Sequence, residues 1–109
     1  MTARDYLGEL EEMVMLAALR LKGDAYGASI LRELDEKAGR EVSRGAVYVI
    51  LERLEGKGLV ESRLGEATGE RGGRARRMVR VTQSGVEALR RSHDARSRLR
   101  EGLDEVFQP

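Results

Sequence analysis

The chain has 109 residues, of which 36% are charged and 4% aromatic, with no cysteine, no tryptophan and a single histidine. This composition excludes disulfides, iron–sulfur clusters, thiolate zinc sites and two-histidine metal motifs, so neither a metal nor another cofactor is expected. No apolar leader opens the chain and no apolar run approaches the roughly 20 residues that cross a bilayer, so we expect a cytoplasmic protein of one small domain with no membrane partner.

The net charge of +1 conceals a local asymmetry. Residues 1–39 carry five basic and eight acidic side chains, whereas residues 63–80 carry six arginines and only two glutamates, a net charge of +4. Affinity for a polyanion depends on the local field rather than on the total charge. Residues 63–80 are therefore a candidate contact for nucleic acid.

Apolar periodicity predicts two helices in the first 40 positions. The first spans about residues 8–21, where apolar side chains recur at spacings of three and four. These are Leu10, Met13, Val14, Leu16, Ala17, Ala18 and Leu21. The second spans about residues 26–37, with Ile30, Leu31 and Leu34 facing inward, and Ala38-Gly39 ends it. The acidic pairs Glu11-Glu12 and Asp35-Glu36 are expected on polar helix faces as solvated charges.

Ser43 is a good N-cap for a third helix over residues 44–56, whose inward stripe is Val47, Ile50, Leu51 and Leu54. The opposite face carries the candidate DNA-binding side chains. Small residues near its start let the backbone approach a phosphate, Arg44 has the geometry to pair with guanine, and a tyrosine phenol can donate to a phosphate. The candidates on this helix are Ser43, Arg44, Gly45, Tyr48, Val49 and Arg53. An ordinary amphipathic surface helix, with Tyr48 half-buried, would show the same pattern.

Residues 60–64 alternate as a half-buried strand, and residues 78–81 fit its antiparallel partner. The connection over residues 65–77 is longer than a usual hairpin loop. Arginine bridges phosphate oxygens well and glycine lets a loop follow a groove, so this wing is a candidate contact for a narrow minor groove. Its candidate residues are Arg71, Gly72, Gly73, Arg74, Arg76 and Arg77. A solvated charged loop or a nuclear-targeting signal is the alternative.

Thr82 can cap a last helix that is predicted to run to about Phe107, longer than the mean of about 11–12 residues. So small a domain cannot cover the far end of this helix, which predicts packing against a second subunit. The predicted interface residues are Met13, Leu89, Leu99, Leu103, Val106 and Phe107. Docking on the first helix of the same chain is the alternative. The lone histidine, His93, is expected at the surface.

The order helix, helix, helix, strand, wing, strand, helix predicts a mainly α fold with a small β-hairpin. We expect a winged helix-turn-helix over residues 1–81 and a C-terminal dimerisation helix over residues 82–109. The sequence contains no phosphate-binding glycine loop, nucleophile elbow or metal-ligand spacing, so no catalytic residue is assigned and an enzyme is not expected.

Three segments together resemble the PadR family of transcriptional regulators, which are bacterial and archaeal winged-helix repressors. They are ELEEMVMLAALRLKGDAYG (9–27), GAVYVILERLEGKGLV (45–60) and RRMVRVTQSG (76–85). The resemblance covers about residues 8–90, and because the chain stops at Pro109 it implies the short-tailed subgroup with one C-terminal helix. It further implies a homodimer joined through that helix, an inverted-repeat operator, and Tyr48 in the DNA surface. Val49 and Met78 depart from the family pattern, which commonly has proline and an aromatic residue there.

The predicted function is a sequence-specific regulator of transcription, a repressor rather than an activator, acting as a homodimer on double-stranded DNA. One alternative is a winged-helix protein-interaction module whose basic wing meets an acidic partner. Another is an effector-sensing dimer, in which a small molecule enters between the terminal helices at the polar break formed by Ser92, His93 and Arg96. The sequence names no such ligand.

Overall fold

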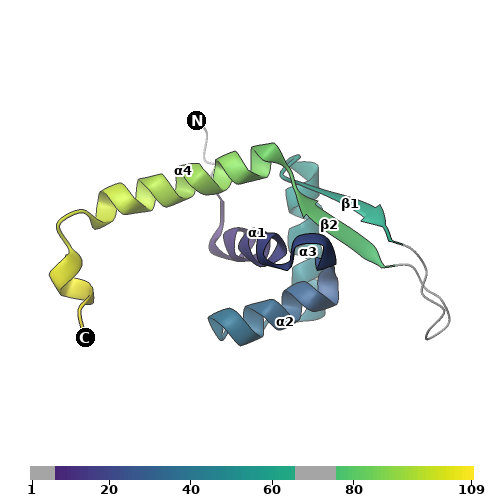
Figure 1. Ribbon diagram of the computed structural model, residues 1–109, viewed down its shortest axis with the longest axis horizontal. Coiled ribbons are helices and arrows are strands. Elements are labelled where there is room, and N and C mark those ends of the chain that lie inside the picture. The colour runs from purple at the N-terminus through teal and green to yellow at the C-terminus, as the bar shows by residue number, and fades with distance from the viewer. Residues whose placement is uncertain (1–6, 66–75) are drawn as a thin grey trace.

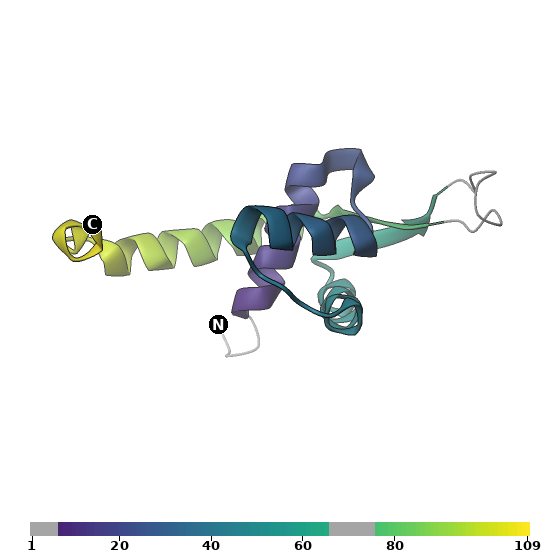
Figure 2. The ribbon, with the colours of Figure 1, turned by 90° about the horizontal axis from the view of Figure 1, so that it is seen from below.

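The structure, a computed structural model, describes residues 7–65 and 76–109 of the chain (Figure 1). In chain order its elements are α1 (Glu9–Leu21), η2 (Lys22–Asp24), α2 (Gly27–Ala38), α3 (Arg44–Gly56), β1 (Val60–Leu64), β2 (Arg77–Val81), α4 (Gln83–Arg100) and η4 (Asp104–Phe107). The three N-terminal helices form the body, the hairpin extends from one side of it, and α4 projects from the opposite side (Figures 1 and 2). The predicted fold class, mainly α with one small hairpin, is confirmed.

The core lies where α1, α2 and α3 pack together and against the hairpin. On α2 and α3 the predicted stripes are confirmed, because Ile30, Leu34, Val47 and Leu54 are buried. On α1 the prediction is confirmed for Val14, Ala17 and Ala18, which are buried, and for Leu10, Met13 and Leu21, which are partly buried against the core, and it was wrong for Leu16. Leu16, predicted to face inward, is 46% exposed, whereas Met15 is completely buried. The buried face of α1 consists of residues 11, 14, 15, 17 and 18, and Leu16 lies outside it.

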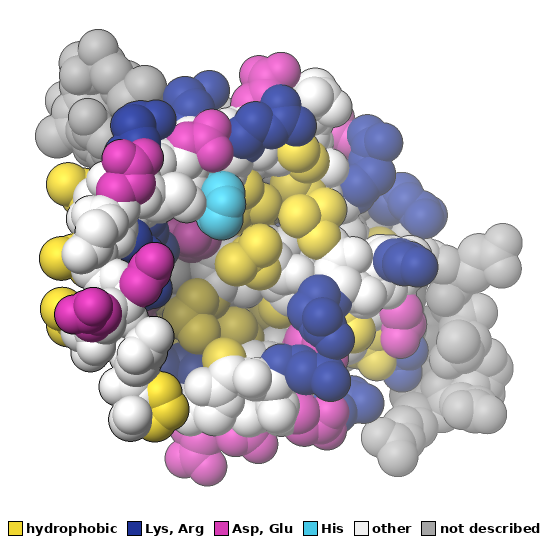
Figure 3. Space-filling view, turned by 60° about the vertical axis from the view of Figure 1, so that its left-hand side comes forward, with side chains coloured by type: hydrophobic (Ala, Val, Ile, Leu, Met, Phe, Trp, Pro, Cys, Tyr) yellow, Lys and Arg dark blue, Asp and Glu magenta, His cyan; other side chains and the backbone are white. Residues whose placement is uncertain are grey.

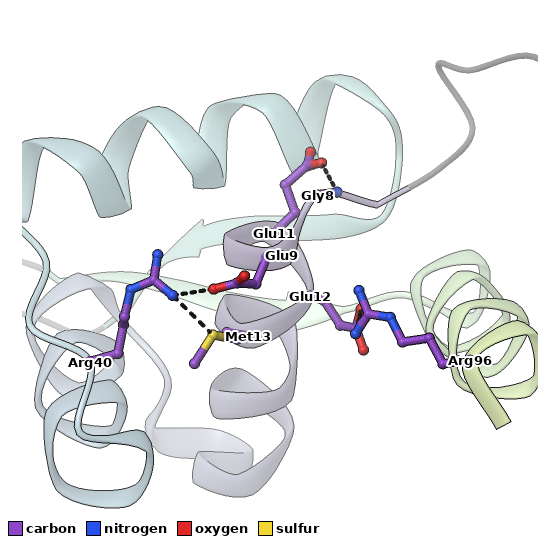
Figure 4. A network of polar contacts seen from close by, with 7 residues as sticks. All are labelled: Gly8, Glu9, Glu11, Glu12, Met13, Arg40 and Arg96. Carbon is purple, nitrogen blue, oxygen red and sulfur yellow. Dashed lines mark hydrogen bonds and ion pairs between the residues drawn. The ribbon is translucent and has the colours of Figure 1, made fainter. Parts of the chain in front are cut away.

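The carboxylates of Glu11 and Glu12, predicted to be solvated, are engaged by other elements. Glu11 is 7% exposed, accepts a hydrogen bond from the backbone N–H of Gly8 at 2.9 Å and pairs with Lys57 at 2.8 Å. Glu12 forms an ion pair with Arg96 of α4 at 2.9 Å (Figure 4). The prediction for these two residues was wrong because their partners lie far along the sequence.

The strands β1 and β2 pair in an antiparallel register from Val60 opposite Val81 to Leu64 opposite Arg77. One further pairing was not predicted. Tyr26, just before α2, forms an isolated β-bridge with Met78, and the neighbouring Val79 N–H donates to the Ala25 carbonyl at 2.8 Å. A pairing of one or two residues is too short to show the alternation of a strand, so the sequence does not predict it.

Thr82 caps α4 as predicted, accepting from the Gly85 N–H at 3.1 Å while its hydroxyl donates to the Gly58 carbonyl at 2.8 Å. The predicted end of this helix near Phe107 was wrong, because α4 ends at Arg100. The chain turns at Gly102, whose φ of 80° lies in the left-handed region that favours glycine, and then forms the separate short helix η4. Over the described ranges, none of the helices has the length and apolarity needed to span a membrane.

Candidate nucleic-acid interface

The N-terminus of α3 is fixed by its cap and left open to solvent. The Ser43 hydroxyl oxygen accepts from the Ala46 N–H at 3.0 Å, as the sequence predicts for an N-cap. Arg44 and Gly45 follow in the first turn, both exposed, and this turn contains no acidic residue. The positive end of the helix dipole and the Arg44 guanidinium therefore act together on any anion placed here.

The face of α3 opposite the core remains uncovered. Tyr48 and Val49 are each 48% exposed, while Val47 and Leu54 on the other side of the helix are buried in the core. Arg53, in the last turn, is also exposed. Its positive charge is one of the influences that lower the pKa of Glu11. The division of α3 into an inward stripe and an exposed candidate face is confirmed.

Tyr48 packs against the first residue of α2. A Cβ added to Gly27 would lie 3.2 Å from both Cζ and Oη of Tyr48, so the phenol rests where Gly27 has no side chain. This contact joins the exposed face of α3 to the start of α2. In the sequence the Tyr26-Gly27 pair stood out only through the family resemblance, because no pattern relates Gly27 to a tyrosine 21 positions later.

The two described arginines at the base of the wing have different surroundings. The Arg76 guanidinium carbon lies 4.5 Å from the centroid of the Tyr26 ring. Arg77 instead donates to Ser62 Oγ at 2.9 Å and to Glu55 Oε2 at 2.8 Å, and Ser62 donates to the other oxygen of Glu55 at 2.7 Å. Arg77 therefore fastens β2 to the end of α3, a contact that sequence reasoning missed. The candidates Arg71, Gly72, Gly73 and Arg74 lie outside the described residues.

The residues predicted to form a dimer interface divide into two groups. Leu89 is 8% exposed and belongs to the core of its own chain, so it is not free to meet a partner. Met13 is partly buried against the same core. The other four form an exposed group on the last turn of α4 and the segment after it. They are Leu99 at 79%, Leu103 at 41%, Val106 at 70% and Phe107 at 58% exposure.

Figure 3 looks onto the α4 side of the molecule, where hydrophobic side chains gather near the middle of the view and charged ones surround them. His93 is exposed, as predicted, and Ser92 is partly buried. Arg96 does not line a cavity with them, because it reaches across to Glu12 of α1. A hollow of about 420 Å³ lies elsewhere, between the end of α1 and the hairpin, lined by residues that include Leu19, Lys22 and Val81.

Known proteins with a similar sequence or structure share this fold. Residues 15–91 match the family described as "Transcriptional regulator PadR-like family". The structure is similar to a PadR-like transcription factor from Bacteroides fragilis, with 26% identity, a TM-score of 0.71 and coverage of 89% of this chain and 88% of that one. It is also similar to a PadR family transcriptional regulator from Eggerthella lenta, with 27% identity, a TM-score of 0.68 and coverage of 92% and 87%. No curated protein matches the chain.

Proposed function

The chain belongs to the PadR-like family of transcriptional regulators, and we propose that it binds double-stranded DNA as a homodimer and represses transcription from an inverted-repeat operator. In this proposal α3 of each subunit enters a major groove and the hairpin lies beside it. A two-fold axis relates the two half-sites, which fall about one helical turn apart, roughly 34–36 Å.

The observation that carries the proposal is the open face of α3. A capped helix end with Arg44 and Gly45 in its first turn, and with Tyr48 and Val49 exposed one turn later, offers donors to phosphates and base edges. The helix is held from behind by buried Val47 and Leu54, so these side chains are presented by a rigid element. B-DNA has a major groove about 12 Å wide, which admits one helix of this kind.

The dimeric part of the proposal rests on the group Leu99, Leu103, Val106 and Phe107. Each of these side chains is at least 41% exposed, and they follow one another at the end that projects from the body. Several exposed apolar side chains at one end of a molecule usually mark an interaction surface. A second copy of the chain is the simplest partner, since a two-fold contact would cover both groups at once.

Binding to duplex DNA at increasing salt concentration tests the proposal directly. A protein that neutralises phosphates shows a steep linear fall of log K against log salt, whereas binding to an acidic protein would leave the chain indifferent to duplex. Fragments selected from genomic DNA would supply the operator. If the purified protein ignored all duplexes at low ionic strength, the DNA-binding function would be abandoned.

The substitution Arg44→Ala tests the role of α3. We expect a loss of about 1–3 kcal/mol in binding the selected operator and relaxed preference at one base pair, because a bidentate contact with guanine is lost. The matched control is Arg90→Ala, which removes an exposed arginine from α4. Equal losses from the two variants would show that Arg44 contributes only its charge.

A further inference from the structure

We propose that Tyr26 is a positioning residue for DNA binding: its ring holds Arg76 at the junction of α2 and the hairpin, where the guanidinium meets a phosphate beside the groove that α3 enters. The inference rests on the proposed function and adds the start of α2 to the binding surface. The sequence-based prediction had placed Arg76 in a minor groove with the rest of the wing.

The backbone explains why these two side chains meet. Tyr26 is extended, with φ −152° and ψ 171°, and its bridge to Met78 fixes it opposite the beginning of β2. The 2.8 Å hydrogen bond from Val79 to Ala25 secures the same pairing. Arg76 lies two positions before Met78 and is therefore the diagonal neighbour of Tyr26 on one face, within reach of a long side chain. The 4.5 Å separation of guanidinium and ring follows from this register.

The alternation of side chains along β2 separates Arg76 from its neighbour. Arg77 points to the other face, where Glu55 offsets its charge at 2.8 Å. Among the described residues no carboxylate forms an ion pair with Arg76. A guanidinium stacked on a ring keeps its full charge, and its N–H donors project from the edge of the plane, where they can bind a phosphate.

Tyr26 also lies next to the candidate face of α3. Its neighbour Gly27 is the residue against which the Tyr48 phenol packs, since a Cβ added to Gly27 would lie 3.2 Å from the phenol oxygen. Arg76, Tyr26 and Tyr48 thus flank one short stretch of backbone. An arginine already held in place loses less side-chain freedom when it binds a phosphate than one that moves freely, so the contact with Tyr26 improves affinity by preorganisation.

A double-mutant cycle measured on one operator duplex tests the inference. Tyr26→Leu removes the ring face and is expected to weaken binding about 2- to 5-fold, the range of an exposed cation–π contact. Tyr26→Phe keeps the face and should bind as the wild type does. Arg76→Ala should weaken binding about tenfold or more and lower the salt slope by about one unit. In the Arg76→Ala background, Tyr26→Leu should have no further effect.

Arg76→Lys keeps the positive charge but stacks poorly on a ring, so it should weaken operator binding about as much as Tyr26→Leu does. Because it leaves Tyr26 unchanged, this variant still tests the contact if Tyr26→Leu folds badly. Equal losses from Tyr26→Leu in both backgrounds would overturn the inference, since Tyr26 would then act through the fold alone. A loss from Tyr26→Phe equal to that from Tyr26→Leu would also overturn it. Failure of the proposed function looks different, because the wild type itself would then bind no duplex at low salt.

Discussion

At the scale of single residues, Glu11 shows how a carboxylate can be buried and still keep its charge. Its burial alone would raise the pKa of the carboxyl group. Hydrogen bonds from Lys57 and from the Gly8 N–H, together with the positive charges of Lys57 and Arg53, outweigh burial and leave the pKa of Glu11 lowered from 4.5. The charged form is therefore the one that the folded chain favours.

This shift predicts a pH-dependent stability. A carboxyl group whose pKa is lower in the folded chain stabilises the fold above its unfolded pKa, and that contribution is lost as the pH falls through the folded value. We expect Glu11→Gln to lower the free energy of unfolding by about 1 kcal/mol at pH 7 and to have less effect below the ordinary value of 4.5. Urea unfolding of both proteins at pH 7 and in mild acid measures the difference.

Glu9→Gln is the matched control, because Glu9 pairs with Arg40 but its side chain is 68% exposed. A surface pair of this kind contributes between about 0 and 1 kcal/mol. A loss from Glu11→Gln that stayed the same at both pH values would contradict the assigned role of the charge.

At the scale of elements, the first turn of α1 connects the other parts of the molecule. Glu9 reaches Arg40 after α2 and Glu12 reaches Arg96 on α4 (Figure 4). Glu11 reaches Lys57 after α3. The Glu12 side chain is only 12% exposed, and its Oε2 atom accepts no hydrogen bond within the described residues despite lying 2.9 Å from Arg96. The ion pair with Arg96 therefore offsets the charge of Glu12, and it ties the outer half of α4 to the body.

Arg96→Ala should release that half of α4. Faster amide hydrogen exchange is expected over residues 92–100, with a stability loss of about 1–3 kcal/mol because Glu12 is left unpaired in a nearly buried site. Exchange in α3 should not change. Arg98→Ala, an exposed arginine on the same helix, is the control and should leave exchange as it is. Equal exchange in the two variants would show that the ion pair does not hold α4.

The same scale shows what the sequence could and could not predict. The Ser43 and Thr82 caps, the stripes of α2 and α3 and both strands have local patterns, and all were predicted to within a residue or two. On α1 only Leu16 was misplaced, because apolar side chains surround much of that helix and periodicity alone did not separate Leu16 from its buried neighbour Met15. The end of α4 was missed although Gly102 marks it, since an apolar pattern continued beyond the glycine.

The candidate DNA-binding site also has features that the sequence predicts and features that depend on tertiary contacts. The open face of α3 was predictable from one helical period, whereas the contact of Arg76 with Tyr26 joins residues 50 positions apart. The Arg77–Glu55 pair likewise depends on how β2 packs beside α3. Patterns within one element predict which residues are exposed, and only the tertiary structure determines which of the exposed charges remain available to a ligand.

At the scale of the whole molecule, the candidate DNA surface and the exposed apolar group lie apart. The first is on α3 in the body, and the second, Leu99, Leu103, Val106 and Phe107, is on the tail, residues 99–109. The tail projects from the body on the side away from the hairpin (Figures 1 and 2). In each subunit of a dimer the tail could then be covered without obstructing α3. Because the two surfaces are separate, substitutions in the tail should change dimer formation without altering the fold of one subunit.

The double substitution Leu103→Ser and Phe107→Ser should convert the proposed dimer to monomers. Burial of each such side chain is worth about 1.5–3 kcal/mol, and a two-fold interface contains each substituted position twice, so the dissociation constant should rise at least about a hundredfold. Sedimentation at several concentrations measures this.

Leu64→Ser is the control, because Leu64 is 73% exposed on the hairpin at the other end of the molecule. Operator affinity should fall as dimerisation is lost, since each monomer contacts one half-site only. If the tail variant remained dimeric, or if Leu64→Ser dissociated the dimer instead, the interface would have to be placed on the hairpin side.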